Sequence, residues 1–130
     1  MTTWTGLVTY ISNNYKVMNQ TDKMIQMGFN LDELRTQTVY LWHLQLMDGQ
    51  EDWVQIESPF ARVDSTDVGA ALKMVENNVC GGLGIAGEFL TIRHAAPLAN
   101  LDLNELERPL QLVLNTADVL ENQFSGQDLF

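Results

Sequence analysis

Apolar residues near the N-terminus recur at steps of three and four positions, which is the spacing of one face of a helix. Thr3 or Thr5 can cap this segment, and the pattern predicts a helix from about Thr5 to Val17. The residues on its apolar face are Trp4, Leu7, Val8, Ile11, Tyr15 and Met18.

The next part of the chain alternates apolar and polar residues, the period of two expected of strands with one buried face. The alternation predicts strands over residues 25–31, 38–47 and 53–57. Asp32-Glu33 interrupts the first strand, and the Asp48-Gly49 pair predicts a hairpin turn between the other two.

A second helix is expected after Ser58-Pro59 ends the third strand, with Asp64 or Ser65 as its cap. Gly81-Gly82 supplies a left-handed stop beyond it. The apolar face of this helix contains Val68, Ala71, Leu72, Val75 and Val79. Two short strands, over residues 83–85 and 89–93, then flank a glycine-containing hairpin turn.

The C-terminal part of the chain predicts a third helix, for which Asp102 and Glu105 can form a capping pair. Its apolar stripe favours packing on the chain's own sheet, and the same helix of a second subunit is the alternative. Pro109 would kink a helix that begins at Asp102, so a short first turn followed by a longer helix from about Arg108 is a second possibility. The stripe contains Leu103, Leu106, Leu110, Val113, Ala117, Leu120 and Phe124.

The order of these elements is helix, three strands, helix, two strands, helix. Strands grouped together and joined by short connections indicate an α+β fold with an antiparallel sheet rather than a doubly wound one. The length of 130 residues fits a single domain over residues 1–130.

Charge narrows the classes of partner. Seventeen acidic residues against seven basic ones give a formal net charge of −10, which repels nucleic acid. The negative charge is then explained either by solubility or by the attraction of a basic partner. No apolar stretch is long enough to span a membrane. Cys80 is the only cysteine, so an internal disulfide is impossible and we expect a cytoplasmic protein.

Motifs that could carry catalysis do not stand in the required context. The glycines at 82, 84 and 87 have the spacing of a dinucleotide-binding loop, but they follow a helix and enter a strand, which is the reverse of that motif. His43 and His94 have no second ligand at a metal-binding spacing, and Cys80 has no neighbouring base. We therefore expect no cofactor, no metal and no enzymatic activity.

Five segments together resemble the type III secretion chaperone-like superfamily, which includes the Tir-chaperone type and the YbjN type. The order of elements is also the order in that superfamily, so the resemblance covers most of the chain. The segments are Ala71-Leu72-Lys73-Met74-Val75-Glu76-Asn77-Asn78, Phe89-Leu90-Thr91-Ile92-Arg93, Pro97-Leu98, Leu101-Asp102-Leu103-Asn104-Glu105-Leu106 and Ala117-Asp118-Val119-Leu120-Glu121.

This resemblance implies a small acidic α+β homodimer that binds a client or regulatory partner protein and catalyses nothing. In secretion members, a segment of the partner wraps around the dimer in extended form and uses apolar patches and strand addition. The candidate protein-binding or dimer surface here comprises Tyr40, Trp42, Leu44, Leu72 and Val75. Core packing is the simpler explanation of the same residues. A small-molecule sensor with a pocket between the sheet and the helices is the competing function.

Overall fold

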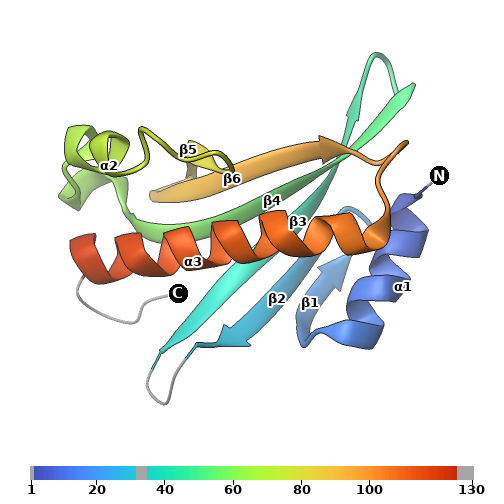
Figure 1. The fold of residues 1–130 in the computed structure, drawn as a ribbon, viewed down its shortest axis with the longest axis horizontal. Coiled ribbons are helices and arrows are strands. Elements are labelled where there is room, and N and C mark those ends of the chain that lie inside the picture. Colours follow the sequence, from blue (N-terminus) through green and yellow to red (C-terminus); the bar gives the residue numbers. More distant parts are fainter. Residues whose placement is uncertain (1, 32–34, 126–130) are drawn as a thin grey trace.

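An antiparallel sheet of six strands forms the centre of the protein in the computed structural model, which describes residues 2–31 and 35–125 (Figure 1). The strands stand in the order β1-β2-β3-β4-β6-β5, and every neighbouring pair is antiparallel. Their bounds are β1 (Val17–Thr21), β2 (Met24–Asn30), β3 (Thr36–Leu46), β4 (Glu51–Arg62), β5 (Gly82–Ala86) and β6 (Phe89–Pro97).

Within the described residues, three α-helices and two single turns of 3-10 helix accompany the sheet. They are α1 (Trp4–Asn14), η1 (Val63–Ser65), α2 (Val68–Met74), η2 (Leu103–Leu106) and α3 (Glu107–Phe124). Figure 1 shows α3 lying across one face of the sheet, α1 beside β1, and α2 at the far end of β4. Among the described residues, no helix is long and apolar enough to cross a membrane.

The hydrophobic core lies between α3 and the face of the sheet that it covers, which we call the inner face. Alternate residues of the strands point to this face, and α3 contributes its apolar stripe to it. Fully or almost fully buried members are Val39, Leu41, Val54, Ile56, Leu90 and Ile92 from the sheet and Leu110, Val113, Ala117 and Leu120 from α3. The opposite face, which we call the outer face, is not covered by α3.

The α+β class and the antiparallel sheet are confirmed, but the number of strands before α2 was wrong. The first helix ends at Asn14, not at Val17, and Val17 begins the unpredicted strand β1, which pairs with β2 through a tight turn. Met18 leaves the predicted helical stripe and packs over Gly28, where a Cβ would lie 2.5 Å from its sulfur. The mostly polar, exposed sequence of β1 gives no alternation by which to recognise a strand.

The second helix is shorter than its apolar pattern predicts. It begins at Val68, where the carboxylate of Asp67, not Asp64 or Ser65, accepts a hydrogen bond of 3.1 Å from the N–H of Ala70. It ends at Met74, so Val79 lies beyond it and is 99% exposed. Most of the predicted apolar face of this helix is therefore not part of the core.

Of two prolines near element ends, Pro59 differs from its sequence prediction and Pro109 follows one of the two predicted alternatives. Pro59 does not end β4, because a bulge next to it lets the strand continue to Arg62. Pro109 sits in the first turn of α3, where a missing N–H costs little, and α3 starts at Glu107 after the separate turn η2. This is the second of the two arrangements that the sequence allowed. The break predicted at Asp32-Glu33 lies outside the described residues.

We predict that Leu110→Asp destabilises the protein by at least about 3 kcal/mol, because it places a charge where an apolar side chain is 1% exposed. Val119→Asp on the same helix is the matched control, since Val119 is 56% exposed and should tolerate the charge. Urea unfolding of both variants measures the difference. Equal midpoints for the two variants would contradict the assignment of the inner face.

Candidate functional site

The outer face of the sheet is rich in aromatic and apolar residues. The register pairs Tyr40 with Glu57, Trp42 with Gln55 and Leu44 with Trp53, which places these side chains on the same face. An uncovered face of an antiparallel sheet is normally polar. Tyr40, Trp42 and Trp53 are nevertheless only half-buried, and Leu44 is 36% exposed. This face therefore presents apolar surface that residues 2–31 and 35–125 do not cover.

A hollow of about 450 Å³ opens on the outer face, within the range of ligand-binding pockets. Four strands contribute to its walls, and the rings of Tyr40 and Trp42 are stacked along one side with centroids 5.8 Å apart. We call this feature the outer hollow. Its lining residues are Tyr40, Trp42, Glu57, Pro59, Ala86, Phe89 and Thr91.

A buried carboxylate forms part of the lining. Glu57 is 3% exposed, and its oxygens accept hydrogen bonds from the indole N–H of Trp42 at 3.0 Å and the hydroxyl of Thr91 at 2.9 Å. The guanidinium of Arg93 also donates to it, so the charge is paired. Glu57 thus fixes the orientation of Trp42. An occupant of the outer hollow would be held chiefly by apolar contact with the aromatic walls.

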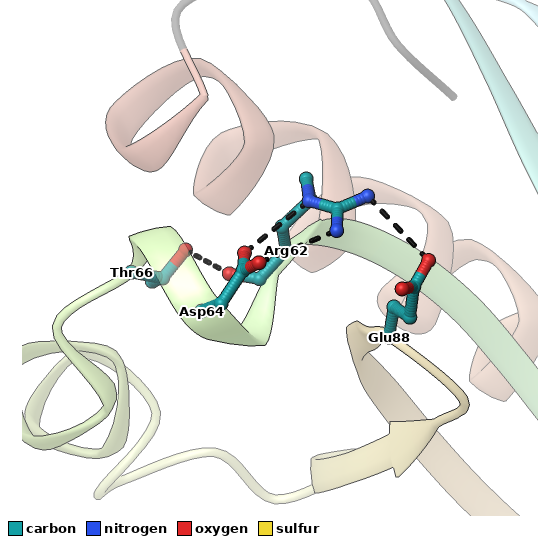
Figure 2. Close-up of polar contacts among 4 residues, drawn as sticks. All are labelled: Arg62, Asp64, Thr66 and Glu88. Carbon is teal, nitrogen blue, oxygen red and sulfur yellow. Dashed lines mark hydrogen bonds and ion pairs between the residues drawn. The ribbon is translucent and has the colours of Figure 1, made fainter.

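A second ion-pair group lies next to the outer hollow. Figure 2 shows the guanidinium of Arg62 between Asp64 and Glu88, which it approaches to 3.2 and 3.6 Å. Hydrogen bonding and attraction by Asp64, followed by attraction by Glu88, raise the pKa of Arg62. The same guanidinium lies 5.8 Å from the ring centroid of Phe89. This group ties β4 to the loop between β5 and β6 and contains one cation among two carboxylates.

The strand β5 is the edge of the sheet closest to the outer hollow, and its last residue, Ala86, lines that hollow. In the described sheet β5 has a neighbour on one side only. Its sequence from Gly82 to Ala86 contains no charge and no proline. Natural edge strands are usually protected by such residues or by bulges. The opposite edge, β1, does contain a bulge and is flanked by Lys16 and Lys23.

His43 on β3 makes contacts that join parts of the fold. The ring of His43 stacks on Trp4 at 5.0 Å and lies 2.9 Å from a carboxylate oxygen of Asp52. Hydrogen bonds from His43 and then Gln45 lower the pKa of Asp52. This cluster ties α1 to the hairpin of β3 and β4. No group of three or more His, Cys, Asp or Glu residues within the described part of the chain is arranged to hold a metal ion.

Two phenols and one carboxylate form a tie that the sequence did not predict. The hydroxyls of Tyr10 and Tyr15 both donate to the carboxylate of Glu107, which joins α1 to the start of α3. Burial, and then the bond to Glu107, raises the pKa of Tyr15.

Elsewhere, burial raises the pKa of the Cys80 thiol, and Cys80 is 8% exposed. These features stabilise the fold and leave the outer face as the candidate site.

The structure separates the five candidate residues into two groups. Tyr40, Trp42 and Leu44 lie together on the outer face, so the core explanation was wrong for them. Leu72 lies on α2 and is 53% exposed, whereas Val75 is partly buried against the core. The outer hollow opens on the face away from α3, whereas the competing small-molecule function places its pocket between the sheet and the helices.

Sequence reasoning did not identify the other residues of the outer hollow. Glu57, Pro59, Phe89 and Thr91 come from β4 and β6, and only the pairing of those strands brings them beside Tyr40 and Trp42. The alternation of β4 does place Glu57 on the same face as Trp53, which is the one local signal for this group.

Comparison with known proteins shows the fold. No protein-family model and no curated protein matches the sequence. A chain from the crystal structure of the ExsC–ExsE complex is similar with a TM-score of 0.64 and 13% identity, over 91% of this chain and 90% of that one. A chain from the HopA1–SchA chaperone–effector complex is similar with a TM-score of 0.60 and 11% identity, over 88% and 87%. The protein therefore shares the fold of these two chains, which agrees with the fold that the resemblance to the type III secretion chaperone-like superfamily implies.

Proposed function

We propose that this protein is a non-enzymatic module that binds an extended segment of a partner protein. The observation that carries the proposal is that an edge strand with one neighbour in the described sheet is continuous with an apolar hollow, because Ala86 belongs to both β5 and the outer hollow. Backbone pairing at a sheet edge gives affinity, and a pocket for a side chain gives specificity. The similarity to a chain from a chaperone–effector complex supports the binding of a partner protein.

The chemistry of the site indicates the kind of segment that fits. The segment would pair with β5 and place a large apolar side chain over Ala86, against Tyr40, Trp42 and Phe89. The net charge of −10 would attract basic residues that flank this anchor. The lone, buried Cys80 accords with a cytoplasmic location, which remains part of the proposal.

We also propose a homodimer, formed through the exposed side of α2. Within α2 only Ala71 is fully buried, while Val68, Leu72 and Met74 are 38%, 53% and 44% exposed. A short helix with this much exposed apolar surface indicates a contact with another chain. This assignment leaves the outer face free for the partner segment.

Binding of a small molecule is the second candidate function, and the size of the outer hollow favours it. Aromatic walls and a fixed carboxylate are features of pockets that hold small ligands. The two functions differ in their need for β5, since a ligand in the outer hollow requires no free edge.

We predict that partners recovered from the native lysate remain bound at both about 0.1 M and about 1 M salt, where the screening length differs roughly threefold. Ile85→Pro should abolish this recovery, because proline removes an N–H from the edge and blocks strand pairing. Ile85→Thr keeps the N–H and is the matched control. Loss of every partner at high salt, or full recovery by the proline variant, contradicts strand addition; no partner at either salt favours the small-molecule function.

For the homodimer, light scattering at micromolar concentration should give twice the 14.7 kDa mass of one chain. Leu72→Glu should give a monomer, because it places a charge in the apolar contact. Lys73→Gln changes the net charge by the same amount at a neighbouring position that is 79% exposed, and it should leave the dimer intact. A parent protein that scatters as a single chain would disprove the dimer.

A further inference from the structure

The guanidinium of Arg93 reaches from β6 across the edge strand. Arg93 stands opposite Glu57 on one side and Gly82 on the other, and its side chain lies on the outer face. Its Nε donates to the carboxylate of Glu57, and its Nη2 donates to the backbone carbonyl of Ile85 in β5. One side chain therefore links the buried carboxylate of the outer face to the backbone of the edge strand.

The side chain of Arg93 can cross β5 because the residue of β5 that lies under it is a glycine, Gly84. A Cβ at Gly84 would lie 2.5 Å from Cδ and Nε of Arg93 and 2.9 Å from its Cζ. These are closer than real Cβ contacts allow, so a side chain at this position would push the guanidinium away. The position of the Arg93 guanidinium therefore depends on a glycine at position 84.

The carbonyl that Arg93 holds belongs to the free edge of the sheet. A two-residue loop, Gly87-Glu88, joins β5 to β6 and closes on the pair Ala86–Phe89. In an antiparallel ladder the bonding groups of successive residues alternate between the two sides of a strand. Ala86 and Gly84 thus bond to β6, whereas the N–H and C=O of Ile85 point to the side where the described sheet ends.

We propose that Arg93 protects the edge of β5 from pairing with other strands, and we call its hydrogen bond to the carbonyl of Ile85 the guard. An incoming strand needs the carbonyl of Ile85 as an acceptor and must displace the guanidinium to reach it. Natural edges are commonly protected by charged side chains of the edge strand itself. Here β5 has none, and the neighbouring strand supplies the protection. Arg93 therefore restricts pairing at this edge to segments that gain enough from the outer hollow to displace it.

This inference rests on the proposed function for its biological meaning, but the guard can be tested without a partner. Without the guard, copies of the protein should pair through their β5 edges. A hydrogen bond from a charged group is worth enough to change the association constant by roughly tenfold or more. The protein without the guard should then form species that are larger than those of the parent and that grow with concentration.

The test compares two charge-neutral double variants by sedimentation velocity across a concentration series. Glu57→Gln with Arg93→Gln removes the guard without leaving a buried carboxylate unpaired. Arg62→Gln with Glu88→Gln makes the same exchange at the neighbouring ion pair of 3.6 Å (Figure 2) and is the matched control. Only the first variant should self-associate, at least tenfold more strongly than the parent, and near-ultraviolet circular dichroism confirms that both are folded.

Adding Ile85→Pro to the Glu57→Gln, Arg93→Gln variant separates edge pairing from misfolding. Edge pairing should disappear with the proline, whereas aggregation of a misfolded chain would persist. The guard is overturned if the unguarded variant associates no more than the parent, or if its association survives the proline. A protein that finds no partner in the lysate and yet self-associates when unguarded would refute the proposed function and leave the guard intact.

Discussion

The packing of α3 against a single face of the sheet is the constraint on which the rest of the structure depends. One amphipathic helix can cover only the strands that lie beneath it, and α3 contacts β3, β4 and β6 through its apolar stripe. The inner face is completed by this contact, together with α1 at the β1 side. No described helix covers the outer face in the same way, and the aromatic residues of β3 remain partly exposed there.

The polar groups of the outer face are arranged to preserve this surface. Glu57 holds the indole of Trp42, and Arg93 both neutralises Glu57 and reaches the edge of β5. A buried carboxylate without these partners would be strongly destabilising. The same contacts that make Glu57 tolerable therefore set the shape of the outer hollow and the accessibility of the edge beside it.

The sequence predicted those helices and turns that are determined by neighbouring residues. It did not predict features that depend on contacts between residues far apart in the chain. The stripe through Leu110 and Val113 predicted a buried helix face correctly, and the hairpin turn that contains Gly87 was also predicted correctly. The strand β1 was missed because its polar residues satisfy no strand pattern; it exists because β2 offers an edge to pair with. Tyr40 and Trp42 alternate like core residues, and only the position of α3 shows that Val39 and Leu41 are the buried partners of that alternation. Likewise, no spacing predicts the contact of Arg93 with Ile85, because it depends on strand pairing and on the absence of a side chain at Gly84.

The proposed function requires that the partner binds as an additional strand at the edge of β5. Hydrogen–deuterium exchange of the protein, with and without a partner that co-purifies with it, measures this pairing at single strands. Strand addition should slow exchange at the outward amides of Leu83 and Ile85 and cause little change along β1. Unchanged exchange in β5 together with protection of residues 17–21 would place the partner at the opposite edge and rule out strand addition at β5.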